Sequence, residues 1–281
     1  MAWKNYAEID ALSYAEELRR DRPRLIVAAL LFAREIAHPD MLPSRYLRRL
    51  DDWADLMRGH LPQGAPELER ATEVARFLSD DLLLRGNTEE YHDPANSFLN
   101  EVIERRVGLP IALSALFLHF AAAAGLAGEG IGLPGHFVVA VRIGSRQYFF
   151  DPFEGTGPLA ESDLRDLLEE RANYRGPLDR EWLAPQDTRA VLARMLHNLR
   201  AVYLDRSDWT FAAAVVERLI LTQPEVHPHL RDLGFILASL GRPVRGAQML
   251  QRYLLAEPDA DDAATVRGSM ESLIQQAARL N

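Results

Sequence analysis

A 34-residue repeat near the end of the chain is the sequence feature that most limits its fold. Pro224 and Pro258 lie 34 residues apart. The other matches at this offset are Ala213 with Ala247, Arg218 with Arg252, Ile220-Leu221 with Leu254-Leu255, and Leu199 with Leu233. A helical unit of this length buries its apolar face by stacking on neighbouring units. Residues 186–281 are therefore predicted to form paired helices, with a last helix at 262–279 as the cap.

The 34-residue period and the proline that ends each unit resemble tetratricopeptide repeats. Stacked repeats of this kind commonly form concave surfaces that bind peptides. The resemblance therefore implies a protein or peptide partner for residues 186–281. An ordinary helical bundle with accidental periodicity is the alternative, because the two copies share few identities.

Residues 1–185 are predicted to form a separate and mainly helical region. Apolar residues recur at helical spacing over 25–36, 46–57 and 68–84, between proline and glycine signals. The stretch 107–128 carries no charged residue, but its glycines and Pro110 limit the helical part to about 110–124, whereas a membrane span needs about 20 apolar residues. It is predicted to be a buried helix rather than a membrane span.

After Gly125 the pattern changes from helix to strand. The segments 135–141 and 147–150 are rich in β-branched and aromatic residues and are joined by Gly144-Ser145-Arg146. Two such segments with a short glycine-containing connection predict an antiparallel hairpin. A helix is expected again over 162–171, with Ser162 as its cap. The predicted fold class is thus α+β, mainly helical with a small antiparallel sheet, followed by helical repeats.

Composition excludes several kinds of chemistry. The chain has no cysteine, so disulfides, cysteine-ligated metals and thiol nucleophiles are excluded, and Lys4 is its one lysine. A net charge of −9 without a basic block argues against a nucleic-acid or anionic-membrane surface. The first eight residues lack the charged-then-apolar layout of a signal peptide. We therefore expect a cytoplasmic protein with no nucleic-acid partner and no membrane partner.

Three further motifs are predicted to be structural. Gly130–Gly135 matches the G-x-G-x-x-G phosphate-binding string, but a helix precedes it and a strand follows, the reverse of the required order. It is predicted to be a turn. His227-Pro228-His229 is predicted to be an inter-helical turn rather than a metal site, and His119 a packed core histidine. No cofactor and no metal are expected.

His136 and Asp151 form the most informative pair. His136 begins the first strand of the hairpin and Asp151 ends the second, so antiparallel pairing brings them within reach of each other. A carboxylate can orient an imidazole for base catalysis. A purely structural histidine–aspartate hydrogen bond explains the same spacing equally well.

The order of motifs resembles the transglutaminase-like (papain-like) core, and most closely the branch of SirB-type bacterial proteins. The motifs are Asp93-Pro-x-Asn96-Ser-Phe-Leu-Asn100-Glu101, Arg106-x-Gly108-Leu-Pro110-Ile, Pro134-Gly-His136-Phe and Asp151-Pro-Phe. In that superfamily a nucleophilic cysteine begins a helix, and a histidine and an aspartate follow on two adjacent strands. The resemblance covers about residues 35–280 and implies a transglutaminase-like domain followed by tetratricopeptide repeats.

The same resemblance implies that the nucleophile is missing. The position of the cysteine falls on Pro110, which has no reactive atom, whereas His136 and Asp151 match the family's histidine and aspartate. Ser114 lies one helical turn beyond Pro110 and is the available substitute, although packing explains it better.

We therefore expect a non-catalytic binding protein that retains a vestigial His136–Asp151 dyad. Asn96, Asn100 and Glu101 are expected to line a polar pocket with this dyad. The alternative is a hydrolase or amide-processing enzyme in which His136 activates water or Ser114. A third reading assigns all function to the repeats, with the N-terminal region as a platform. The oligomeric state stays open.

Overall fold

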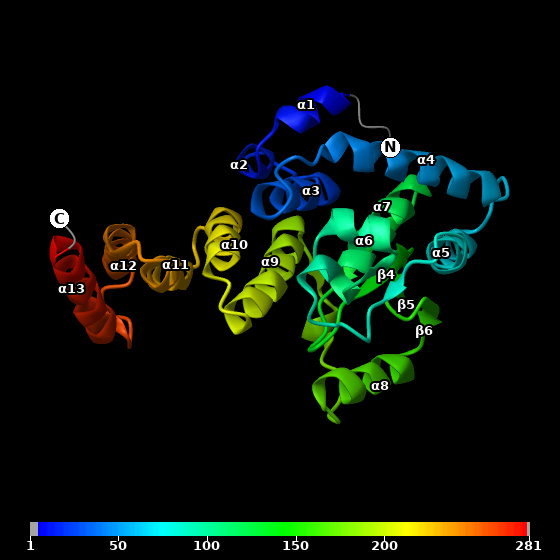
Figure 1. The fold of residues 1–281 in the computed structure, drawn as a ribbon. Coiled ribbons are helices and arrows are strands. Elements are labelled where there is room, and N and C mark those ends of the chain that lie inside the picture. Colours follow the sequence, from blue (N-terminus) through cyan, green and yellow to red (C-terminus); the bar gives the residue numbers. More distant parts are fainter. Residues whose placement is uncertain (1–4, 280–281) are drawn as a thin grey trace. The chain divides into compact units, whose positions relative to one another are not determined.

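Helices make up most of the chain in the computed structural model, which describes residues 5–279 (Figure 1). Residues 1–4, which include Lys4 and the start of the N-terminal segment, lie outside the described residues, as do 280–281. The described chain divides into two units. One comprises the residues up to Arg34 together with His38–Met195, and the other comprises Glu35–Ala37 and the residues from Leu196 onward.

The first unit begins with a group of helices around the apolar helix α3. Ile26 through Ala33 on α3 are all nearly inaccessible to solvent, because neighbouring helices cover every side of it. Tyr14 of α2 meets Phe32 of α3 edge to face, with the ring centroids 6.0 Å apart. The helices here are α1 (Tyr6–Ala11), α2 (Tyr14–Leu18), α3 (Leu25–Ile36), α4 (Pro43–His60), α5 (Glu67–Arg76), α6 (Leu99–Arg105), α7 (Pro110–Ala123) and α8 (Glu161–Ala172).

The helix predicted over 68–84 is confirmed as far as Asp81, but its second part is not an α-helix and residues 82–84 lie outside it. The α-helix α5 ends at Arg76, and Phe77–Asp81 forms a π-helical turn in which the Leu82 amide donates to the Phe77 carbonyl at 2.9 Å. The wider turn leaves the consecutive residues Phe77 and Leu78 both buried. Short 3₁₀ turns follow at Pro94–Asn96 and Arg180–Leu183.

The sheet contains five strands rather than the hairpin alone. The predicted hairpin is confirmed: β4 and β5 pair antiparallel from Val139–Phe150 to Ile143–Arg146, which leaves Gly144 and Ser145 in the turn. The sheet order is β6-β5-β4-β3-β7, with every pairing antiparallel. Its strands are β3 (Ala127–Ile131), β4 (Val138–Ile143), β5 (Arg146–Asp151), β6 (Thr156–Leu159) and β7 (Pro185–Gln186), and a separate parallel pair joins β1 (Arg85–Gly86) to β2 (Val107–Gly108).

Helices cover both faces of this sheet. On one face, α7 packs against β3 and β4. On the other, Leu164 and Leu168 of α8 pack with Val138 and Ala140 of β4. Successive side chains of a strand point to opposite faces, so all of Val138–Val141 are buried. This arrangement places Asp151, the last residue of β5, under helical cover together with His136, which lies two residues before β4 rather than in the strand.

Two smaller predictions needed correction. Ser162 does not cap α8: the helix begins at Glu161, and Asp163 accepts a hydrogen bond from the Ala160 amide at 2.7 Å. The Gly130–Gly135 string is only partly a turn, because Gly130 and Ile131 belong to β3. In α8 the Asp163 carboxylate, one turn into the helix, thus accepts the amide of the residue before the helix, as the glutamate or glutamine of a capping box does.

The second unit consists of helices only. They are α9 (Thr188–Asp205), whose first residues belong to the first unit, α10 (Trp209–Thr222), α11 (Pro228–Ser239), α12 (Pro243–Ala256) and α13 (Ala263–Arg279). Leu230, Leu250, Tyr253 and Val266 form its core between α11, α12 and α13. α13 occupies the place predicted for the capping helix. Among residues 5–279, no helix is both long and apolar enough to cross a membrane.

Candidate functional site

The predicted contact between His136 and Asp151 is present. Nε2 of His136 lies 2.7 Å from Oδ2 of Asp151, and each side chain is only 1% exposed. The other carboxylate oxygen, Oδ1, accepts the backbone amide of Phe153 at 2.9 Å. Because Asp151 engages Nε2, Nδ1 is the ring atom left to act on any other group.

Phe153 covers the pair. Its ring meets the His136 imidazole edge to face, with the centroids 5.8 Å apart and the planes at 88°. The guanidinium of Arg171 lies over the same phenyl ring at 5.4 Å from its centroid, and Tyr91 packs on its edge at 6.2 Å. An ion pair of 2.6 Å between Arg171 and Glu154 holds the guanidinium in place. The histidine and aspartate are therefore enclosed by side chains rather than set in an open cleft.

The turn before β4 allows this close packing. Gly135 has φ of +69°, and a Cβ there would lie 2.5 Å from the carbonyl oxygen of Arg171 at the end of α8. Only glycine fits such a position without strain. Arg194 of α9 donates to the carbonyls of Leu133 and His136 at 2.8 and 2.5 Å. The backbone around His136 is thus fixed by its close contact with the end of α8 and by the hydrogen bonds from Arg194 of α9.

The residue that the resemblance places at the nucleophile position is Pro110, which has no reactive side-chain atom. Pro110 is the first residue of α7, where a proline loses no hydrogen bond, and it is buried. Ser114 is wholly buried one turn further on, and its Oγ donates to the carbonyl of Phe137 at 3.4 Å. This contact ties α7 to the backbone beside His136, which is a packing role.

Asn96 is a structural residue. It is fully buried, its Nδ2 donates to the carbonyl of Glu90 at 2.7 Å, and its Oδ1 accepts from Asn87 at 3.0 Å. Its own carbonyl accepts the amide of Leu109, just before α7. Asn96 therefore organises the entry into α7.

Asn100 and Glu101 have a different neighbour. Nδ2 of Asn100 donates to Glu101 at 3.3 Å, and Glu101 lies 3.7 Å from Nε2 of His38. In residues 5–279, no hydrogen bond or ion pair joins Asn96, Asn100 or Glu101 to His136 or Asp151. These three residues therefore have no direct polar contact with the dyad, and their place in a common pocket stays a prediction.

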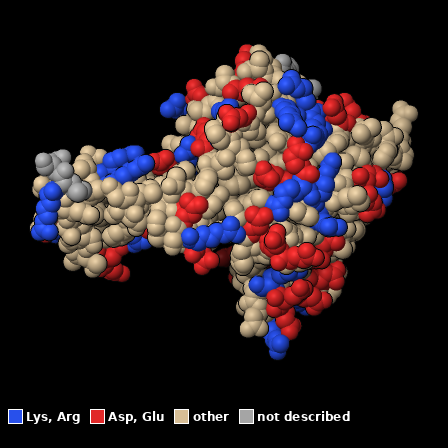
Figure 2. All heavy atoms as spheres, in the orientation of Figure 1, with Lys and Arg blue, Asp and Glu red and all other residues tan. Residues whose placement is uncertain are grey.

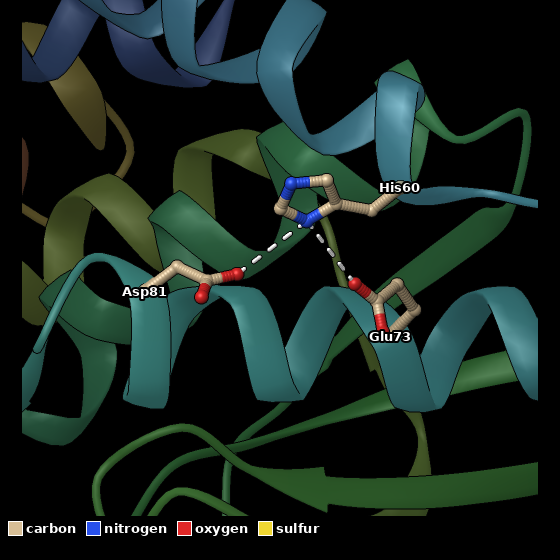
Figure 3. Close-up of side chains that lie close together, drawn as sticks. All are labelled: His60, Glu73 and Asp81. Atoms are coloured by element: carbon tan, nitrogen blue, oxygen red, sulfur yellow. Dashed lines mark ion pairs between the residues drawn. The ribbon is translucent and has the colours of Figure 1, made fainter.

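One cluster of titratable side chains could not be predicted from the sequence, because its members are far apart in the chain. His60, Glu73 and Asp81 present ligand atoms that lie within 4.8 Å of one another (Figure 3). However, Arg76 already supplies a cation: its Nη2 lies 2.6 Å from Glu73, 3.0 Å from Asp81 and 3.4 Å from Nδ1 of His60. The cluster is an arginine-centred ion-pair network and carries no metal assignment.

The histidines of the second unit are also structural. Pro228 begins α11, and Nδ1 of His227 pairs with Glu257 at 2.8 Å. The rings of His197 and His229 lie 5.5 Å apart, and burial lowers the pKa of His229 to about 4. Burial likewise lowers the pKa of His119 to about 4, as expected of the packed histidine predicted there.

A buried helix followed by a hairpin that carries histidine and aspartate defines a transglutaminase-like domain, and helical repeats follow it. Comparison with family models agrees: residues 44–197 match the transglutaminase-like superfamily, and residues 199–271 match the tetratricopeptide repeat. The chain belongs to the transglutaminase-like superfamily, and it has the predicted architecture of that domain followed by repeats.

Its relatives include bacterial proteins called UPF0162. The UPF0162 protein of Xylella fastidiosa strain Temecula1 is 31% identical over 96% of this chain and 94% of its own length. That of strain 9a5c is 32% identical over 89% of each chain. The UPF0162 protein of Vibrio cholerae is 29% identical over 62% of this chain and 64% of its own. The similarity thus spans both the domain and the repeats.

Proposed function

We propose that this chain is a non-catalytic transglutaminase-like protein that binds a peptide or protein partner. The observation that carries the proposal is the enclosed His136–Asp151 pair beside a helix that begins with Pro110, the residue that the resemblance places at the nucleophile position. A nucleophile must reach its base. Here neither proline nor the fully buried Ser114 offers an accessible one. The retained pair then serves to hold β4 and β5 together beneath Phe153.

The direct test is amide turnover by the purified full chain. A glutamine-containing peptide with an amine acceptor reports transfer, and ammonia release reports hydrolysis. We expect both rates to equal those of His136→Ala and of the buffer blank. Turnover that disappears in His136→Ala would overturn the proposal.

The repeats supply the partner surface in this proposal. A groove of about 260 Å³ lies between α12 and α13, and its lining is mainly apolar. Val244 and Ile274, at its rim, are 54% and 53% exposed. The residues that line it are Val244, Ala247, Gln248, Gln251, Met270, Ile274 and Ala277.

The repeat itself indicates that this groove receives a helix. At the 34-residue offset Ala277 corresponds to Pro243, where α12 begins, yet α13 continues through this position to Arg279. In the preceding 34-residue repeat, the first turn of α12 lies near α10, and Arg245 is 3.7 Å from Glu217. The counterpart of Glu217 is Gln251, in the groove. The groove is thus the place that a further helix would cover, and its occupant is an amphipathic helix of a partner protein with apolar and uncharged polar residues.

A site-specific photocrosslinker at Gln251 tests this surface. A partner captured there from the cell should be lost when Ile274→Glu is introduced, and retained in Gly268→Ala, which lies on α13 outside the groove. Retention of the partner by Ile274→Glu, or its loss in both variants, would contradict the docking site.

The alternative function is hydrolysis by the His136–Asp151 dyad with water or Ser114. The 2.7 Å geometry of the dyad favours it, because general-base help of this kind is worth about 10² to 10⁴ in rate. A fluorophosphonate probe for reactive serines tests the Ser114 route, and the amide-turnover assay tests the water route. We expect no labelling, whereas labelling that is lost in Ser114→Ala would support the enzyme.

The remaining assignments belong to the same proposal. We place the protein in the cytoplasm, without cofactor, metal, nucleic-acid or membrane partner. Acidic and basic side chains are mixed over the face shown in Figure 2. We keep 1–185 and 186–281 as the two domains, and separate expression of each range, followed by circular dichroism, tests that boundary.

A further inference from the structure

Arg194 is a partly buried arginine that has no carboxylate partner among residues 5–279. In the described part of the chain, its only hydrogen bonds are those from Nη2 to the carbonyls of Leu133 and His136. Its guanidinium lies 5.3 Å from the centroid of the Phe137 ring. Burial lowers the pKa of Arg194, opposed only by the phenol of Tyr91. Charges held in such surroundings are ordinarily paired with an opposite charge.

The free end of the guanidinium points at Gly132. A Cβ at this glycine would lie 2.7 Å from Nη1 of Arg194 and would collide with the amide nitrogen of Gln186. Within residues 5–279, neither Nη1 of Arg194 nor the side-chain amide of Gln186 makes a hydrogen bond. The glycine therefore leaves two polar side-chain ends converging beside the turn 132–136.

Two arginines and two carboxylates lie in this part of the fold. Arg171 and Arg194 both act on the phenol of Tyr91, although burial is the larger effect and raises the Tyr91 pKa. The charge of Arg171 is already balanced by Glu154 at 2.6 Å. Asp151 is buried and is already engaged by His136 and the Phe153 amide. Arg194 is thus the guanidinium whose charge this part of the fold leaves unbalanced.

We propose that Arg194 and Gln186, at the Gly132 turn, form a binding site for a small oxyanion, a carboxylate or a phosphate. Guanidinium nitrogens recognise either group through charge-assisted hydrogen bonds, and the primary amide adds a donor beside them. The site lies close to the dyad, because Arg194 also donates a hydrogen bond to the backbone carbonyl of His136. It goes beyond the proposed function, because an anion binds here whether or not His136 reacts.

Isothermal titration calorimetry of the full chain tests the site, with inorganic phosphate and acetate as separate probes. Sodium chloride at matched ionic strength serves as the blank, at pH 7. We expect saturable one-to-one binding of at least one probe, and the tighter probe identifies the ligand class. Arg194→Gln should weaken binding at least tenfold.

Gln186→Glu is the sharper variant. It places a carboxylate beside Arg194 without altering any hydrogen bond of the described structure, so it should abolish anion binding and raise Tm. Folding of each variant is checked by circular dichroism, and Gln186→Glu keeps the test valid should Arg194→Gln fail to fold. No saturable binding above the chloride blank, or equal binding by wild type and Gln186→Glu, would overturn the site. Neither result depends on turnover, so the site and the proposed function fail separately.

Discussion

The imidazole of His136 and the carboxylate of Asp151 are joined at 2.7 Å while both are almost completely excluded from solvent. In an enzyme this pair would face a nucleophile. Here it lies beneath Phe153, and α7 begins with Pro110, which has no reactive side-chain atom. In such a buried pair, removal of one member leaves the other without its hydrogen-bond partner, which is costly.

Asp151→Ala should therefore destabilise the protein strongly. It leaves both Nε2 of His136 and the Phe153 amide without their acceptor. Loss of such buried hydrogen bonds costs about 2–4 kcal/mol of unfolding free energy. Urea denaturation followed by circular dichroism measures the change. The exposed Asp166 provides the control, since Asp166→Ala should change the free energy by less than about 0.5 kcal/mol. Equal effects of the two variants would show that the pair is not structural.

His119 should make the protein sensitive to acid. Burial lowers its pKa to about 4 from the ordinary value near 6.5. The unfolded chain therefore binds a proton more readily, so the stabilisation is complete above about pH 6.5 and is lost as the pH falls toward 4. The loss is up to about 3 kcal/mol. Urea denaturation of wild type and His119→Gln at pH 7 and pH 4.5 measures how much of the acid-induced loss of unfolding free energy comes from His119. The variant should lose less stability on acidification, and an unchanged pH dependence would contradict the assignment.

Gly246 should be intolerant of a side chain. A Cβ there would lie 2.8 Å from the carbonyl oxygen of Gly234, across the contact between α11 and α12. Gly246→Ala should cost about 1–3 kcal/mol, because the helices must separate. Gly268→Ala on α13, where nothing described lies within 4 Å, should instead stabilise the helix by up to about 1 kcal/mol. Thermal denaturation of both variants gives the comparison, and two changes of the same sign would disprove the close packing.

The hairpin, the buried helix and the repeats could be predicted because each depends on local patterns. Val138–Val141 has strong β propensity, and the Gly144-Ser145 turn sets the register of the pairing. Strands β3, β6 and β7 were missed. β3 contains two glycines in five residues and β6 reads Thr-Gly-Pro-Leu, so their pairing depends on the sheet edge that β4 and β5 provide.

The dyad could be predicted and its enclosure could not. Pairing of the strands brings His136 to Asp151, but the cover comes from Phe153 and from Arg171, at the end of α8. Such contacts are set by tertiary packing. For the same reason, the sequence does not predict that the Glu101 carboxylate lies close to His38.

Histidine modification tests most directly whether the dyad is enclosed. Diethylpyrocarbonate reacts with accessible imidazoles, and peptide mass spectrometry locates each adduct. In the native protein the exposed His92 should be modified while His136, at 1% side-chain exposure, stays unmodified until the chain is unfolded in urea. Modification of native His136 at the rate of His92 would contradict the account, because it would show an open site with an accessible base.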